Sequence, residues 1–255
     1  DRRLAAAPSQ SRAATSAAVG AALDELARVS AALTRGVPGF GARRFPFGTA
    51  LLTAVILAVF VAEVASGGSL ETDTLERLGA LVPARVAAGE GWRIVTALFL
   101  HMGPVHLVMN LLALLPIGIY LERRLGAART VASLLLSGAI PMAAHVGFWA
   151  LGGQAVTTVG ASGAVMGGVG AAGAVLLRAV LDDRLPEARR WLRSLLVLIA
   201  VQSLIDLLIP AVDFLGHALG LAVGFCLGAI RVRLGAPRTL LVGVPAVAVA
   251  LGGHW

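Results

Sequence analysis

Four polar residues in apolar surroundings are the side chains of this sequence best suited to chemistry: Ser162, His217, His106 and Asn110. Ser162 lies between small residues where an uncharged loop gives way to an apolar helix. Small neighbours let a substrate backbone approach the hydroxyl, and the unpaired N–H groups of a helix start can bind an oxyanion. His217 can take the serine proton and return it to a leaving amine, because an imidazole exchanges protons near neutral pH. The pair therefore predicts a serine hydrolase dyad.

His106 and Asn110 are four residues apart and share one helix face. Both can donate hydrogen bonds to a tetrahedral oxyanion, and one such donor contributes about 3 kcal/mol to catalysis. Taken singly, each residue also has a structural interpretation. A membrane serine bonds its own helix or a neighbouring helix, a histidine joins two helices, and His106 with Asn110 anchors a loop.

The elements that position these side chains are membrane helices. The chain has 255 residues, of which 58% are hydrophobic and 14% charged, and its mean hydropathy is +0.86. These values predict an all-α, polytopic membrane protein. A membrane-spanning helix requires about 20 residues. We expect apolar segments near this length at 47–65, 104–121, 130–150, 160–180, 191–209, 214–230 and 239–253.

The basic residues indicate how these spans are oriented. All 21 are arginines, and they flank the apolar segments instead of forming a basic face, which argues against a nucleic-acid partner despite the net charge of +7. They gather in the tail and in three connections: Arg2, Arg3, Arg12, Arg28, Arg35, Arg43 and Arg44, then Arg123, Arg124 and Arg129, then Arg178, Arg184, Arg189, Arg190 and Arg193, then Arg231, Arg233 and Arg238. By the positive-inside rule we expect a cell-membrane protein with a cytoplasmic N-terminus and an outside C-terminus.

Three regions follow from this pattern. We expect a partly flexible cytoplasmic tail at 1–45, a core at 46–230 with a long first loop at 66–103, and a cytoplasmic connection with a seventh helix at 231–255. The chain begins with Asp1 and shows no signal peptide, so we expect its natural N-terminus to be missing or processed.

The orientation places the four polar residues in the same leaflet, because spans two, four and six all enter from outside. Glycines at 216, 220, 224 and 228 form a stripe on span six, and Gly163, Gly167 and Gly170 lie on a similar face of span four. If these faces meet, Ser162 and His217 come within hydrogen-bond range.

Other polar residues are expected to serve structure. Asp213 either orients His217 or caps span six, and we favour the cap. Gln202 and Asp206 are expected to bond another helix rather than take part in catalysis, and His145 to bond a carbonyl freed by Pro141. Cys226 is the single cysteine, so the sequence suggests no metal site and no cofactor.

Together these motifs resemble the rhomboid family of intramembrane serine proteases over roughly residues 48–230. The resemblance rests on a set of short patterns in the right order: Trp92 and Arg93; His101, His106 and Asn110; Glu122 and Arg124; Gly160 to Gly163; and Gly216, His217, Gly220 and Gly224.

The resemblance implies a six-helix catalytic core, to which a seventh helix is a known addition. It implies Ser162 as nucleophile, His217 as base, and His106 and Asn110 at the oxyanion site. His101, Trp92, Arg93, Glu122 and Arg124 would support the scaffold and loop. The substrates would be single-span membrane proteins, cut within or beside the membrane segment near the outer face.

One position departs from the family pattern. Met166 stands where an aromatic ring often stacks on the catalytic histidine, and a methionine fixes the imidazole of that histidine less firmly.

Two other functions compete with proteolysis: an inactive relative that binds membrane clients, and a transporter with a histidine proton relay. The sequence leaves the oligomeric state open.

Overall fold

The computed structural model describes residues 45–182, 188–208 and 213–233, and the expected tail and seventh span lie outside them. Helices dominate this part of the chain, whose only β-pairing is an isolated bridge between Leu81 and Thr158. The prediction of an all-α membrane bundle is therefore confirmed.

Six long helices correspond to the first six predicted spans, with ends that differ by a few residues. They are α2 (Phe47–Ala65), α6 (Gly103–Leu125), α7 (Ala127–Ala150), α8 (Ser162–Leu181), α9 (Ala188–Leu208) and α10 (Phe214–Arg233). By length and composition α2, α6, α7 and α8 can cross a membrane, and α10 holds a shorter apolar stretch, Phe214–Ile230. The molecule is thus a multi-pass membrane protein.

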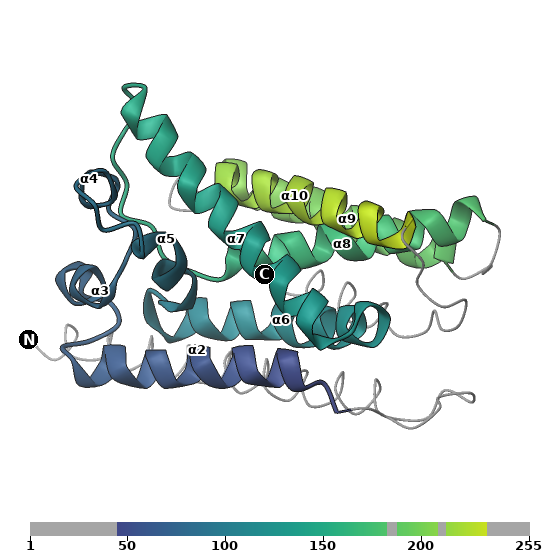
Figure 1. The fold of residues 1–255 in the computed structure, drawn as a ribbon, viewed down its shortest axis with the longest axis horizontal. Helices are drawn as coiled ribbons and strands as arrows, with labels where there is room; N and C mark the ends of the chain where they lie inside the picture. The colour runs from purple at the N-terminus through teal and green to yellow at the C-terminus, as the bar shows by residue number, and fades with distance from the viewer. Residues whose placement is uncertain (1–44, 183–187, 209–212, 234–255) are drawn as a thin grey trace, which may run out of the picture.

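The long first loop folds into short helices at one end of the bundle, at the left of Figure 1. They are α3 (Thr72–Leu78), α4 (Pro83–Ala87), α5 (Arg93–Thr96) and the 3-10 turn η1 (Ala97–Phe99). Leu75, Ala80 and Leu100 bury a small apolar cluster of their own within this region. The loop is therefore an ordered layer across the helix ends.

Helix α8 is the central helix of the bundle. In its most apolar window 78% of the residues are buried, against 28 to 39% in α2, α6 and α7. Its sequence is rich in glycine and alanine, which let neighbouring backbones approach closely. The helix that begins at Ser162 is consequently surrounded by protein rather than by lipid.

The contact between α8 and α10 is made by the two predicted glycine faces. A Cβ atom added at Gly220 would collide with the carbonyl of Gly163, and one at Gly224 with the carbonyl of Gly167. On α8, a Cβ atom at Gly170 would in turn collide with the α10 backbone. This part of the prediction is confirmed, since the two backbones are separated by no side chain along this line.

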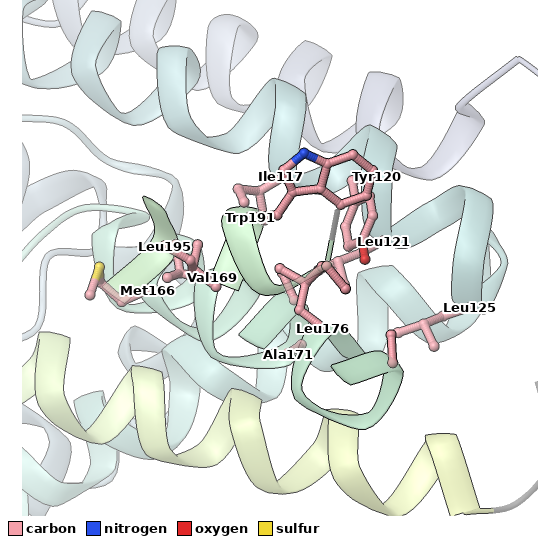
Figure 2. Close-up of a cluster of buried hydrophobic side chains, with 13 residues drawn as sticks. Ile117, Tyr120, Leu121, Leu125, Met166, Val169, Ala171, Leu176, Trp191 and Leu195 are labelled. Atoms are coloured by element: carbon pink, nitrogen blue, oxygen red, sulfur yellow. The ribbon is translucent and has the colours of Figure 1, made fainter. Parts of the chain in front are cut away.

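Away from the glycine contact, α8 packs on α6 and α9 through larger side chains (Figure 2). Ile117 and Leu121 come from α6, Val169 and Leu176 from α8, and Trp191 from α9. In Figure 2 Met166 lies at one end of this cluster and Leu125 at the other. This apolar packing fixes α9 beside α8.

Candidate functional site

Ser162 is the first residue of α8, and Ala161 precedes it as the N-cap residue without a side-chain cap. Within the helix, the N–H groups of Ser162 and Gly163 have no carbonyl one turn earlier to bind. Ser162 is half-buried at this end of the bundle. The position offers a hydroxyl and outward-pointing N–H groups side by side, as an oxyanion site requires.

His217 lies in the first turn of α10, where its N–H donates to the Asp213 carbonyl at 3.0 Å. Its neighbour Gly216 has its carbonyl 3.5 Å from the position of a Cβ atom on Gly163. The residues next to Ser162 and His217 are thus close to each other, so the first turns of α8 and α10 lie side by side.

His106 faces the loop that leads into Ser162. A Cβ atom on Gly160 would lie 2.7 Å from Cε1 of the His106 ring, and Gly160 has a φ of +124°. The His106 imidazole of α6 therefore packs against the loop that leads into Ser162.

Asn110 is buried, and its amide nitrogen donates to the His106 carbonyl at 3.0 Å, within helix α6. The amide is thus engaged with its own helix one turn below the His106 ring. Its predicted role at an oxyanion remains a prediction.

His101 is fully buried where the first loop joins α6. Its N–H donates to Glu63 Oε1 at 3.0 Å, and its Nδ1 is 3.1 Å from the Phe99 carbonyl oxygen. Its ring centroid is 5.2 Å from that of His106. Burial lowers the pKa of His101 to about 4, so the ring is neutral and the loop is anchored without an added charge. Glu63, which sequence analysis did not single out, is the partner of this anchor.

Trp92 and Arg93 lie in the first loop, where they contact other residues of that loop. The Arg93 guanidinium bonds Glu90 Oε2 at 2.6 Å and the carbonyls of Glu76 and Ala80 at 2.6 and 3.0 Å. It also lies 4.6 Å from the Trp92 ring. These contacts tie the end of α3 to α5.

The first loop also forms hydrogen bonds with the segment 157–160, which leads to Ser162. Leu81 and Thr158 exchange two backbone hydrogen bonds of 3.0 Å, and Gly160 donates to the Ala97 carbonyl at 2.9 Å. Glu76 accepts a hydrogen bond from Thr157 at 3.0 Å. The position of Ser162 is consequently fixed by the first loop as well as by α8.

Glu122 and Arg124 lie at the opposite end of α6. The Glu122 carboxylate accepts hydrogen bonds from the N–H groups of Gly48 and Thr49 and from the Thr49 hydroxyl, at 2.8 to 3.0 Å. It therefore satisfies the unpaired donors at the start of α2. Arg124 lies over the Tyr120 ring at 5.6 Å. Glu122 on α6 is thus the hydrogen-bond partner of the start of α2.

The partner of His217 is Asp206, on α9. Asp206 Oδ2 is 2.9 Å from His217 Nδ1, and both side chains are buried. The expectation of a bond to another helix is confirmed for Asp206, although the sequence did not identify the histidine, whereas Gln202 bonds Asp206 within α9. A carboxylate in an apolar span was the signal, since such residues rarely occur there without a function.

Asp213 has different partners. Its Oδ1 accepts the Gly216 N–H at 2.8 Å, which makes it the predicted cap of α10. Its Oδ2 lies 2.8 Å from His145 Nε2, so the expectation that His145 bonds a freed carbonyl is wrong. The C-terminal end of α7 meets the start of α10, and a carboxylate there is a stronger acceptor than a carbonyl. Burial opposes ionisation of Asp213, but the hydrogen bonds from His145 and Gly216 outweigh it and lower the pKa of Asp213.

Met166 is buried in the cluster of α6, α8 and α9.

Among the residues that the structure describes, no group of three or more His, Cys, Asp or Glu side chains is arranged to hold a metal ion.

Comparison with known proteins shows which family the sequence matches. The model of the rhomboid domain matches residues 88–234, which is more than half of the chain. The rhomboid protease GluP of Bacillus subtilis (strain 168) is 34% identical over 203 residues, covering 77% of this chain and 38% of that protein. The mitochondrial RHOMBOID-like protein 6 of Arabidopsis thaliana is 41% identical over 162 residues, covering 62% of this chain and 50% of that protein.

The chain thus spans 38 and 50% of the length of these two relatives. The matched region runs from the first loop to the end of α10, and it includes Ser162, His217, His106 and Asn110. By the match to the rhomboid domain, this chain belongs to the rhomboid family.

Proposed function

We propose that this protein is an intramembrane serine endopeptidase in which Ser162 is the nucleophile and His217 the general base. The observation that carries the proposal is the backbone contact of Gly163 with Gly216 and Gly220, which sets the first turns of α8 and α10 side by side. The relative named as a rhomboid protease supports the reaction class. The substrates are single-span membrane proteins, cut within or beside the membrane segment near the outer face.

The reaction begins when the Ser162 hydroxyl attacks the scissile carbonyl while His217 Nε2 takes its proton. The carbonyl oxygen becomes an oxyanion, which accepts hydrogen bonds from the free N–H groups at the start of α8 and from His106 and Asn110. The intermediate collapses, the C–N bond breaks, and His217 returns the proton to the leaving amine. Water, deprotonated by His217, then hydrolyses the acyl-serine.

In this proposal the N-terminus is cytoplasmic and Ser162 lies toward the outer face of the cell membrane. The first loop and the loop before Ser162 then cover the outer ends of the helices. A substrate segment must leave its helical conformation to present its backbone to Ser162, so helix-destabilising residues in the substrate favour cleavage.

The test is cleavage of a single-span substrate by the purified protein in liposomes. Wild type should cleave it, and Ser162→Ala and His217→Ala should each lower the rate by ~10³-fold or more. Ser194→Ala is the matched control, because this serine bonds the carbonyl of Arg190 within α9, and its rate should equal that of wild type. Undiminished cleavage by Ser162→Ala would exclude the assignment.

Labelling of Ser162 by a fluorophosphonate separates an enzyme from a client-binding relative. The wild type should be labelled and the Ser162→Ala variant should not. A wild type that retains the substrate, resists labelling and leaves the substrate intact would be a binding protein instead.

A further inference from the structure

The imidazole of His217 is held from a third helix. Asp206 on α9 places Oδ2 2.9 Å from His217 Nδ1, and the side chains are 2 and 8% exposed respectively. Burying a carboxylate this far from water costs free energy unless it is paired. The partner of Asp206 is His217, the residue that the proposed reaction needs as base.

The carboxylate is itself oriented. Gln202 lies one turn earlier on α9, and its amide nitrogen donates to Asp206 Oδ1 at 2.7 Å. Each oxygen of Asp206 therefore has its own partner. The chain of contacts runs from the amide of Gln202 through the carboxylate of Asp206 to the imidazole of His217.

This contact decides which nitrogen of His217 can act on a serine. A carboxylate at Nδ1 keeps the proton on that nitrogen and leaves the lone pair on Nε2. The Nε2 atom then takes the serine proton, and the carboxylate stabilises the imidazolium that forms.

The other nearby carboxylate is occupied elsewhere. The two oxygens of Asp213 are bound to Gly216 and His145. Among the described residues, the other titratable side chains with an electrostatic interaction with His217 are those of His106 on α6 and Asp213, and neither side chain hydrogen-bonds the His217 ring.

We propose that Asp206 is a positioning residue for His217, so that Ser162, His217 and Asp206 act as a triad with Gln202 orienting the acid. This inference rests on the proposed function. The inference adds to the proposed dyad a residue from α9, whereas Ser162 lies on α8 and His217 on α10.

The experiment measures kcat, KM and thermal unfolding for Asp206→Asn in liposomes or detergent, together with the rate of labelling by a fluorophosphonate. Asparagine keeps the shape but can present its amide to Nδ1 and favour the wrong tautomer. We expect kcat and the labelling rate to fall by ~10²- to 10⁴-fold, with KM within about 3-fold of wild type. Asp206→Glu should recover part of this loss.

Asp213→Asn is the matched control, because it makes the same change of charge at a carboxylate beside the same helix. It should lower the unfolding temperature through the lost contacts with His145 and Gly216, and keep kcat within about 3-fold of wild type. A purely structural role for Asp206 would give the same pattern in Asp206→Asn, a lower unfolding temperature with an unchanged kcat, and would overturn the proposal.

Gln202→Met decides the matter if Asp206→Asn does not fold. The methionine retains the length of the side chain but removes the donor to Asp206, and kcat should fall by ~10-fold in a folded protein. An unchanged kcat would overturn the triad. Loss of activity in Ser162→Ala with full activity in the folded Asp206 or Gln202 variants would refute the triad alone, whereas full activity in Ser162→Ala would refute the proposed function itself.

Discussion

At the residue scale, the site has one buried neutral residue and one ionised residue that each join separate parts of the chain. His101 is neutral because burial lowers its pKa to about 4, and it ties the first loop to Glu63. Asp213 is ionised and joins α7 to α10. These two anchors respond to acid in different pH ranges, because burial lowers the pKa of His101 from its ordinary value near 6.5, whereas hydrogen bonds lower that of Asp213 from 3.8.

The His101 anchor predicts a loss of stability in mild acid. Between about pH 4 and 6.5 the unfolded chain binds a proton at His101 that the folded chain does not. The free energy of unfolding therefore falls as the pH drops through this window, by roughly 3 kcal/mol if the whole shift is expressed. Thermal unfolding of wild type and His101→Gln at pH 7 and pH 4.5 would measure it. A wild type that loses no more stability than the variant would contradict the prediction.

Gly160 predicts a more local effect on activity. It has a φ of +124°, and a Cβ atom there would press on the His106 ring. Gly160→Ala should lower the cleavage rate by ~10-fold or more, because it displaces both His106 and the chain entering Ser162.

Gly152→Ala is the control for this variant. Gly152 also has a positive φ, of +92°, but a Cβ atom there would meet nothing within 4 Å. It shares the backbone strain without the contact, so its rate should stay close to that of wild type. Equal loss of activity in both variants would assign the effect to strain alone.

At the element scale, α8 and α10 are joined by glycine. The two helices approach so closely that the Gly167 carbonyl occupies the place of a Cβ atom on Gly224. Packing of small residues is a main source of association between membrane helices, because lipid is as apolar as the side chains. The same contact line ends at Ser162 and His217, so helix packing and the proposed chemistry are coupled.

Gly224→Val should therefore destabilise the protein and abolish cleavage together. We expect a loss of about 3 kcal/mol or more, as for other overpacked sites, seen as a lower unfolding temperature in detergent. Gly147→Ala on α7 is the control, because a Cβ atom there meets nothing within 4 Å, and it should leave both quantities unchanged. Full cleavage by Gly224→Val would contradict the close contact.

At the scale of the whole molecule, the described helices form a bundle with one elaborated end. The short helices of the first loop and the chain leading to Ser162 gather there (Figure 1), while Glu122 caps α2 at the other end. The arginine pattern predicts that the elaborated end faces outward, since residues 151–159 carry no charge and Arg123, Arg124 and Arg129 lie at the opposite end of α7.

Accessible cysteines test this orientation in intact cells. In a Cys226→Ala background, Gln154→Cys should react with a membrane-impermeant maleimide from outside. Arg129→Cys should react only after the cells are opened. Both positions are exposed, so access depends on the side of the membrane. The reverse pattern would invert the topology and with it the face at which cleavage is expected.

The sequence by itself determined the six long helices and the glycine faces that join α8 to α10. Apolar length and small-residue spacing are local properties, so they can be read along the chain. The same local information placed Ser162 at a helix start and Asp213 at the cap of α10. It also predicted the residues proposed for the dyad, Ser162 and His217.

Only the tertiary structure decided which partner each polar side chain has. Gln202 and Asp206 were expected to bond another helix without a named partner, and the approach of α9 to α10 is what puts Asp206, not Asp213, on the His217 ring. In the same way, Asp213 takes His145 from α7. Helical periodicity gives the face on which a residue lies, whereas the rotation and depth of neighbouring helices fix which faces meet, and these depend on the packing of the whole bundle.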